Sequence, residues 1–153
     1  MTQKPQFSPE AMYIPPMKAV RRFDEDGAAH YEALTYSDKP TGVEILDALA
    51  RALSAGKSFK PVLQVYGITV EELSTLCSLL LGKKLADLER EVHLRLADDL
   101  LRYTNLLQEE VAQRSGLINR QQLAYMYRRW YKCTPDERRR QLRRPRDVGR
   151  YRF

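Results

Sequence analysis

Beyond the first forty residues, apolar side chains recur every three or four positions, which is the period of an amphipathic α-helix. The longest uninterrupted stretch is 84–102, where Leu85, Leu88 and Val92 belong to one apolar stripe and charged residues lie between them. At 1.5 Å per residue this stretch predicts a helix about 28 Å long. The first forty residues show no sustained period. The pattern therefore predicts an all-α fold preceded by an irregular N-terminal arm.

Two capping signals reveal a repeat on either side of this helix. Thr69 and Glu72 have the spacing of a capping box, in which the hydroxyl and the carboxylate accept hydrogen bonds from otherwise unpaired backbone N–H groups. Asn119 and Gln122 repeat the spacing. Each capped helix follows a shorter helical stretch and a glycine-containing turn, so the sequence predicts two helix-turn-helix units. These units span 58–81 and 105–131.

The predicted organisation is two helix-turn-helix subdomains joined by a long linker helix. Two such units held rigidly would place helices in successive major grooves of B-DNA, about 34 Å apart. The segments are an N-terminal arm at 1–40, a first helix-turn-helix unit at 41–83, the linker helix at 84–103, a second unit at 104–144 and an arginine-rich tail at 145–153.

Prolines are concentrated in the N-terminal arm, where each one fixes φ and disfavours helix in the residue before it. Residues 1–16 are therefore expected to be extended or disordered. After the Asp26-Gly27 turn signal, a short helix is expected around Ala28–Leu34. The residues of the arm indicate no purpose for it, and it is too short for a sensor domain.

Positive charge is concentrated at the C-terminal end. Residues 114–153 hold 13 Lys/Arg and 3 Asp/Glu, a net charge of +10, whereas the rest of the chain has a net charge of −4. One end of the protein is therefore suited to a polyanion, and nucleic acid is the leading candidate. The alternative is an ordinary solvated basic face with a disordered tail.

Motifs that carry chemistry are absent from the sequence. It has no glycine-rich phosphate loop, no HExxH and no GxSxG, and Cys77 and Cys133 lie far apart without CxxC spacing. His30 and His93 have no cysteine or serine partner nearby in sequence, and His93 is expected at the surface of the linker helix. The sequence predicts a protein that is not an enzyme, with no cofactor or metal and with reduced thiols. Because no apolar run reaches membrane-spanning length and no secretory signal is present, a cytoplasmic location is expected.

Short motifs follow one another in a fixed order along the two units. In the second unit they are Thr104-Asn105-Leu106, Glu110-Val111-Ala112, Gly116-Leu117, Leu123, Tyr127, and Thr134-Pro135 followed by Arg139. In the first unit and the linker helix they are Gly67-Ile68-Thr69, Leu73-Ser74, Gly82, Leu88, Leu94, Ala97 and Leu100-Leu101. In this order and spacing the chain resembles the DNA-binding domain of the AraC/XylS family of bacterial transcription regulators over about residues 43–144. The resemblance implies two helix-turn-helix units on a linker helix and sequence-specific binding of double-stranded DNA.

The first unit departs from the family's pattern. Glu71 and Glu72 would repel the phosphate backbone, and Thr75 stands where the family commonly has an arginine. This unit is therefore expected to be poorly suited to direct readout. Its weaker candidates for DNA contact, carried over from the resemblance, are Thr69, Ser74 and Thr75.

The end of the same helix is apolar where the family has polar residues and lysine. Two interpretations are open for Leu79, Leu80 and Leu81. Either some of these leucines are exposed and form, alone or with the N-terminal arm, a surface for a protein partner. Or they are additional core that packs against the arm.

The first turns of the second unit's capped helix are predicted to read DNA bases. Arginine can bind guanine in a bidentate manner, glutamine can bind adenine in the same way, and an alanine can touch the methyl group of thymine. A tyrosine can reach a phosphate or make an apolar contact with a base. The candidate readout residues are Arg120, Gln121, Gln122, Ala124 and Tyr125.

The cations behind this turn are predicted to contact phosphates, which set affinity and register without specifying sequence. If six of them engage, the logarithm of the binding constant falls against the logarithm of salt with a slope of roughly −5. The tail beyond them is expected to follow the DNA backbone, enter a minor groove, bind RNA or stay disordered. The predicted phosphate contacts are Asn119, Arg128, Arg129, Lys132, Arg138, Arg139, Arg140, Arg143 and Arg144.

Two functions follow as hypotheses. The first is a sequence-specific regulator of AraC type without a sensor domain, in which the second unit supplies most of the base readout. The alternative is an AraC-like fold repurposed as a protein- or RNA-binding module, which the carboxylates and leucines of the first unit favour.

Overall fold

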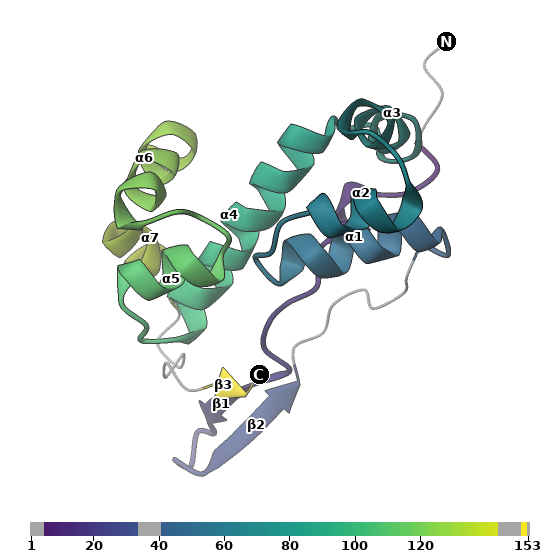
Figure 1. The fold of residues 1–153 in the computed structure, drawn as a ribbon. Helices are drawn as coiled ribbons and strands as arrows, with labels where there is room; N and C mark the ends of the chain where they lie inside the picture. Colours follow the sequence, from purple (N-terminus) through teal and green to yellow (C-terminus); the bar gives the residue numbers. More distant parts are fainter. Residues whose placement is uncertain (1–4, 34–40, 144–150, 153) are drawn as a thin grey trace.

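The computed structural model describes residues 5–33, 41–143 and 151–152. In Figure 1 the linker helix α4 crosses the molecule diagonally, with α1–α3 on one side and α5–α7 on the other. This arrangement confirms the predicted fold of two helix-turn-helix units on a long helix. The elements in chain order are the 3-10 helix η1 (Pro9–Met12), β1 (Ala19–Phe23), β2 (Ala29–Ala33), α1 (Glu44–Ser54), α2 (Lys60–Tyr66), α3 (Val70–Leu81), α4 (Leu85–Tyr103), α5 (Gln108–Arg114), α6 (Arg120–Tyr131), α7 (Pro135–Leu142) and β3 (Tyr151–Arg152).

The predicted capping signals form at both recognition-type helices. The hydroxyl of Thr69 accepts a hydrogen bond from the Glu72 backbone N–H at 3.1 Å, and the Glu72 carboxylate accepts one from the Thr69 N–H at 3.3 Å. At the start of α6, Asn119 Oδ1 accepts from the Gln122 N–H at 2.9 Å. These bonds satisfy N–H groups that a helix start leaves unpaired, so each helix begins where the sequence predicted.

Helix α4 supplies the central strip of the hydrophobic core. Leu88 and Leu96 are buried along it, while α3 adds Cys77 and α6 adds Tyr127, both with no exposed surface. Burial raises the pKa of the Cys77 thiol to about 11, so this cysteine is a protonated core residue at neutral pH. The two units therefore share one core instead of forming two. None of the helices in the described ranges is long and apolar enough to cross a membrane.

The described part of the N-terminal arm is irregular before its strands, apart from η1, and it packs into this core. Met12 and Met17 have no exposed surface, and the backbone N–H of Ile14 donates to Ser54 Oγ on α1 at 2.9 Å. Burying one methionine side chain contributes about 1.5–3 kcal/mol, so the two buried methionines help to hold the arm against the helices. The sequence of the arm shows no helical period because single residues of the arm enter the core, and not one face of a helix.

A small sheet replaces the helix predicted around Ala28–Leu34, so that prediction is wrong. Strands β1 and β2 pair antiparallel from Ala19↔Ala33 to Phe23↔Ala29, and β3 pairs with the other edge of β1. The turn between them contains Gly27 at φ 80°, a conformation that favours glycine. Cross-strand pairing in this hairpin, with β3 on its other edge, outweighs weak local helix propensity. The fold is thus helical with an added three-stranded sheet.

The two helix-turn-helix units touch each other beside α4 through a pair of glycines. A Cβ atom on Gly56 would lie 2.4 Å from the carbonyl oxygen of Arg114, and one on Gly116 would lie 2.8 Å from Nε2 of His93. Neither position accepts a side chain without a shift of the units. His93 is only 8% exposed, so the expectation of a surface histidine is wrong. His93 is buried because its turn of α4 faces this contact between the two units, which we call the joint.

Candidate nucleic-acid interface

Helices α3 and α6 are structural counterparts. Each has 12 residues, begins at a side-chain N-cap and ends at a left-handed residue, Gly82 for α3 and Lys132 for α6. Aligned from cap to cap, Val70 corresponds to Arg120 and Leu79 corresponds to Arg129. The same backbone therefore presents two different sets of side chains, which allows a direct comparison of their surfaces.

The outer face of α6 is exposed and basic in its first turns. Arg120, Gln121 and Tyr125 are exposed, and Tyr125 has 61% of its surface in contact with solvent. Ala124 is partly buried. The Gln122 side chain is bound within the protein. Its oxygen accepts a hydrogen bond from the Ile118 N–H at 2.7 Å, which stabilises the turn before α6.

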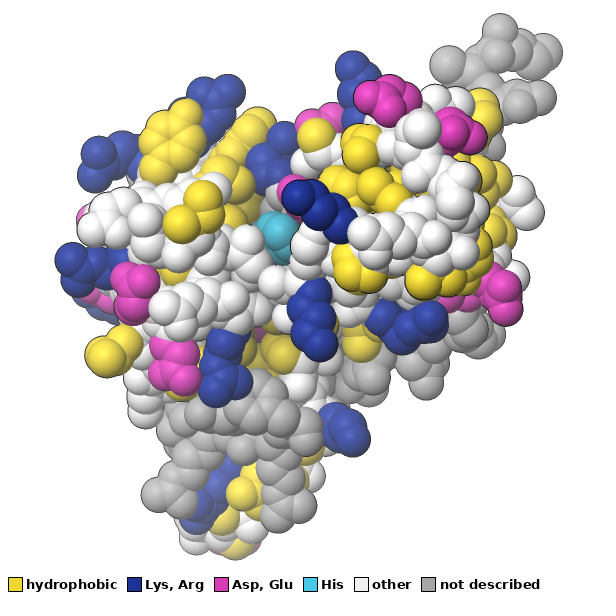
Figure 2. All heavy atoms as spheres, viewed as in Figure 1, with side chains coloured by type: hydrophobic (Ala, Val, Ile, Leu, Met, Phe, Trp, Pro, Cys, Tyr) yellow, Lys and Arg dark blue, Asp and Glu magenta, His cyan; other side chains and the backbone are white. Residues whose placement is uncertain are grey.

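Further cations continue along α6 and beyond it. Arg128, Arg129, Lys132 and Arg140 are all exposed. Arg129 stacks on Trp130 with its guanidinium carbon 5.2 Å from the ring centroid, which leaves its N–H groups available at the rim. Figure 2 shows Lys and Arg side chains spread over this side of the molecule. These four side chains form the exposed cationic set of the second unit.

Three other predicted phosphate contacts bind within the protein. Arg138 donates two hydrogen bonds to the Asp98 carboxylate, at 2.9 and 3.2 Å, and the Tyr127 hydroxyl donates to Asp98 Oδ1 at 2.7 Å. The bonds to Asp98 raise the pKa of Arg138 above the ordinary arginine value. Asp98 therefore connects α4 to both α6 and α7.

Arg139 and Arg143 bind the C-terminal end of α4. Arg139 donates to the Leu101 carbonyl oxygen at 2.9 Å and to the Leu106 carbonyl oxygen at 2.7 Å. Arg143 donates to the Arg102 carbonyl oxygen at 3.1 Å and also to Thr104. Carbonyl groups at a helix C-terminus lack intrahelical partners and carry partial negative charge, so cations there are stabilising. The position of Arg144 lies outside the described residues.

The outer face of α3 differs from that of α6 in charge and polarity. Its first turn exposes Glu71 and Glu72, and α3 contains no lysine or arginine. The three weaker contact candidates make local bonds: Thr69 caps α3, Ser74 Oγ accepts the N–H of Leu85 at 3.3 Å, and the Thr75 hydroxyl donates to the Glu71 carbonyl oxygen at 2.9 Å.

The three leucines at the end of α3 have different environments. Leu79 is 71% exposed, whereas Leu81 is 1% exposed and belongs to the core. Leu80 is partly buried, and its carbonyl oxygen accepts the N–H of Phe7 from the arm at 2.9 Å. Leu80 and Leu81 therefore pack in the core or against the arm, as the second interpretation expected, whereas Leu79 is exposed and a protein partner for it stays a prediction.

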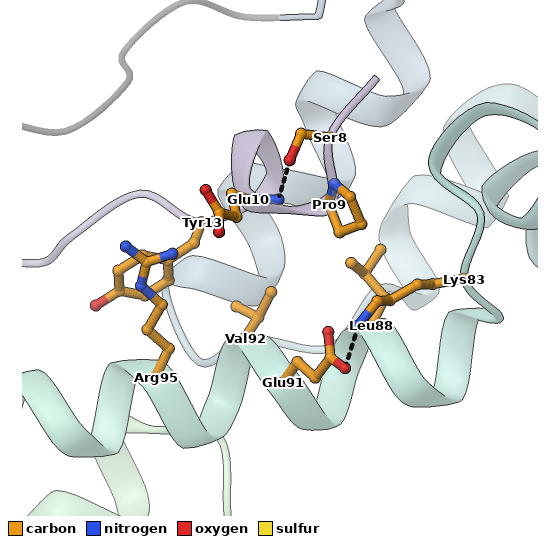
Figure 3. A pocket seen from close by; sticks show the side chains of 9 residues that line it. All are labelled: Ser8, Pro9, Glu10, Tyr13, Lys83, Leu88, Glu91, Val92 and Arg95. Atoms are coloured by element: carbon orange, nitrogen blue, oxygen red, sulfur yellow. Dashed lines mark hydrogen bonds and ion pairs between the residues drawn. The ribbon is translucent and has the colours of Figure 1, made fainter. Parts of the chain in front are cut away.

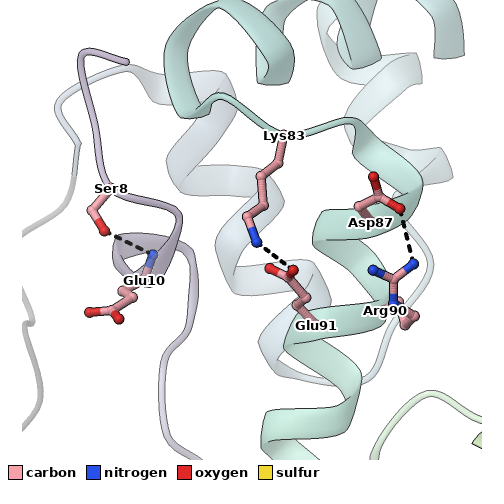
Figure 4. Close-up of polar contacts among 6 residues, drawn as sticks. All are labelled: Ser8, Glu10, Lys83, Asp87, Arg90 and Glu91. Carbon is pink, nitrogen blue, oxygen red and sulfur yellow. Dashed lines mark hydrogen bonds and ion pairs between the residues drawn. The ribbon is translucent and has the colours of Figure 1, made fainter. Parts of the chain in front are cut away.

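A hollow of about 350 Å³ lies between the arm and α4 (Figure 3). Its lining has two cations and two carboxylates, and Figure 4 shows two ion pairs at its edge: Lys83 binds Glu91, and Arg90 binds Asp87 at 2.9 Å beside it. Because cations and carboxylates neutralise one another here, the hollow does not extend the positive surface of the second unit. Its lining residues are Ser8, Pro9, Glu10, Tyr13, Lys83, Leu88, Glu91, Val92 and Arg95.

Comparison with known proteins identifies the fold. No protein-family model matches the chain, and no curated protein matches it in sequence. The structure is similar to the C-terminal domain of the two-component response regulator yesN from Fusobacterium nucleatum subsp. nucleatum ATCC 25586, with a TM-score of 0.56 and 18% identity over 63% of this chain and 94% of that one.

Two further solved structures are similar. One is a transcriptional regulator from Chromobacterium violaceum with an AraC-type DNA-binding domain, with a TM-score of 0.53 and 22% identity over 64% of this chain and 90% of that one. The other is the xylose-binding transcription activator xylR, with a TM-score of 0.57 and 19% identity over 75% of this chain but 31% of that one. The chain therefore has the fold of AraC-type DNA-binding domains, as the sequence resemblance implied.

Proposed function

We propose that this chain is a transcription regulator that binds double-stranded DNA and reads sequence with α6. The observation that supports the proposal most is the difference between two equivalent helices in one molecule. In the same backbone setting, α6 exposes Arg120, Gln121 and Arg128 where α3 exposes Val70 and Glu71. A polyanion favours the first surface and is repelled by the second.

The proposed readout follows from the chemistry of the exposed first turns. Arg120 would bind guanine O6 and N7, Gln121 would bind adenine N6 and N7, and Ala124 would touch a thymine methyl group. Tyr125 would lie against a base or a phosphate at the groove edge. Gln122 would contribute indirectly, because its bond to Ile118 sets the turn that presents Arg120.

The proposed phosphate contacts are fewer than the sequence indicated. Arg128, Arg129, Lys132 and Arg140 remain, with Asn119 at the N-terminus of α6 as a neutral contact. Four engaged cations give a slope of roughly −3.6 for the logarithm of binding constant against the logarithm of salt. The guanidinium groups that bind within the protein are proposed to stabilise the second unit instead of contacting phosphates; they belong to Arg138, Arg139 and Arg143.

The test is a selection of bound genomic fragments at two salt concentrations, followed by affinity measurements on the recovered site. Replacing Arg120 and Gln121 with alanine should cost about 1–3 kcal/mol for each lost base contact and relax the site preference. Arg51→Ala, which removes an exposed cation of α1, is the matched control and should leave the preference unchanged. A featureless pool of fragments, or equal discrimination by the parent and the double variant, would contradict sequence-specific reading.

The alternative, an interaction module for protein or RNA, has one observation in its favour. The exposed face of α3 carries carboxylates and Leu79 and no cation. A carboxylate face favours a protein partner over RNA, because RNA shares the phosphate charge of DNA. This surface can serve a partner while α6 binds DNA, so the two functions are not exclusive.

A further inference from the structure

The start of α6 is held by a carboxylate from the neighbouring helix. Glu109 lies in the first turn of α5, and its Oε2 atom accepts a hydrogen bond from the Arg120 backbone N–H at 3.2 Å. Arg120 is the first residue of α6, where the backbone N–H groups have no partner within the helix. The bond therefore joins α5 to α6, which lie on the same side of α4 in Figure 1.

Two more N–H groups at this end of α6 also have side-chain acceptors. Asn119 Oδ1 accepts from the Gln122 N–H at 2.9 Å, and the Gln122 side-chain oxygen accepts from the Ile118 N–H at 2.7 Å. Of these acceptors only the Glu109 carboxylate is charged. The amide N–H of Asn119 can still donate to a phosphate beside the helix end. The backbone N–H groups at the positive end of the helix dipole are where a phosphate would bind, and the free protein places a carboxylate there.

Glu109 brings this negative charge to a surface that is otherwise positive. Residues 111–133 contain five Lys/Arg and no Asp/Glu. The other carboxylate in the first turn of α5, Glu110, is bound to Arg114 at 3.2 Å within the same helix. In the first unit the acidic residues lie in the first turn of α3 itself, and α2 has none in its first turn. The second unit therefore combines a basic helix with a carboxylate from outside that helix at its start.

A carboxylate in this position affects specific and nonspecific DNA complexes differently. In a specific complex Arg120 and Gln121 would hold the first turn of α6 against base edges, so the end of the helix would face bases instead of phosphates. In a nonspecific complex the phosphates supply essentially all of the attraction, and the N–H groups at the start of α6 would be one of their binding sites. The Glu109 carboxylate repels a phosphate there, so it weakens nonspecific binding more than specific binding.

We infer that Glu109 is a specificity-determining residue, which excludes phosphate from the backbone N–H groups at the start of α6 and so selects against DNA held by its backbone alone. Repulsion of the wrong partner raises specificity without any added contact to the right one. The hydrogen bond also makes Glu109 a positioning residue, because it fixes the backbone of Arg120 relative to α5. The inference rests on the proposed function, since it concerns how α6 discriminates between DNA sequences.

Two substitutions separate the charge of Glu109 from its hydrogen bond. Glu109→Gln keeps a side-chain oxygen that can accept the Arg120 N–H and removes the charge, whereas Glu109→Ala removes both. Fluorescence anisotropy with the full chain measures the affinity for the selected site and for a random duplex of equal length. Glu109→Gln should raise affinity for the random duplex by about two- to fivefold and leave affinity for the selected site near that of the parent. Glu109→Ala should in addition lower affinity for the selected site, because the Arg120 backbone loses its positioning.

Glu25→Gln is the matched control, because it makes the same change of net charge in the exposed turn between β1 and β2. It should leave the ratio of the two affinities unchanged, and thermal melts confirm that each variant is folded. An unchanged ratio in Glu109→Gln would overturn the inference, and so would a ratio that falls only because the selected site binds more weakly. Loss of affinity for both duplexes, which a merely structural role predicts, would overturn it too. Equal binding of both duplexes by the parent would instead contradict sequence reading by α6, and the inference would then lose its basis.

Discussion

At the scale of single residues, neighbouring arginines of one helix have opposite roles. On α7, Arg138 binds the Asp98 carboxylate inside the protein while Arg140 points to solvent. Arg138, Arg139 and Arg140 are adjacent in the sequence. Whether each guanidinium group stabilises the fold or stays exposed depends on which carboxylate or carbonyl group lies opposite it. Only the packing of α7 on α4 decides this.

The pair of arginines gives a test in which stability and binding separate. Arg138→Ala removes two hydrogen bonds from the Asp98 carboxylate, which then keeps the Tyr127 hydroxyl as its donor, so the free energy of unfolding should fall by about 2 kcal/mol in urea denaturation. Arg140→Ala should change it by no more than about 0.5 kcal/mol. In DNA titrations Arg140→Ala should lower the salt slope by roughly 0.9, and Arg138→Ala should leave it unchanged. The reverse pattern would assign Arg138 to the interface.

Lys132 is a cation in a position that favours glycine. Its φ of 59° places it in the left-handed region, where its counterpart in α3 is Gly82 at φ 71°. Lys132→Gly should raise the free energy of unfolding by about 0.5–1 kcal/mol, because relief of the left-handed strain exceeds the lost attraction to the helix C-terminus. The same change should lower the salt slope of DNA binding by roughly 0.9. A variant that is both less stable and equally salt-dependent would show that Lys132 has no part in binding.

At the scale of elements, the helices could be predicted from the sequence and the sheet could not. The period of α4 and the capping pairs Thr69–Glu72 and Asn119–Gln122 are local signals, and all of them formed. Strands β1 and β2 form a hairpin whose strands show no alternating pattern, and the pairing of β3 with β1 joins residues far apart in the chain, which no local pattern indicates. The same holds for the candidate site. The cap at Asn119 predicted where the first turn of α6 begins, whereas no local pattern predicted the internal partner of Arg138.

The joint between the two units makes stability depend on pH through His93. Burial lowers the pKa of His93 below its ordinary value of 6.5, and its Nε2 atom has no hydrogen-bond partner. The unfolded chain therefore takes up a proton at a higher pH than the folded chain. This contribution to stability is complete above about pH 6.5 and is lost as the pH falls from there through the lowered pKa of the folded state. Denaturant titrations between neutral and mildly acidic pH should show a smaller loss for His93→Gln than for the parent.

The control for that experiment is His30→Gln. His30 lies on β2 with its Nδ1 atom 2.8 Å from Asp24, and it takes no part in the contact between the two units. Its replacement should leave the acid dependence close to that of the parent. An equal loss of stability in the parent and in His93→Gln would show that the joint tolerates a charged imidazole.

At the scale of the whole molecule, α4 carries two equivalent helices, α3 and α6, whose exposed surfaces differ in charge. A protein that used both would protect two major-groove segments about 10 base pairs apart. With Glu71 and Glu72 facing the second groove, we expect hydroxyl-radical footprinting of the selected site to show one protected segment, at the position of α6. Glu71→Gln with Glu72→Gln should lengthen that footprint or raise affinity for nonspecific DNA, because it removes the repulsion without adding a base contact. Two protected segments in the parent protein would mean that α3 enters a groove of DNA despite its carboxylates. The proposal that only α6 reads DNA would then be wrong.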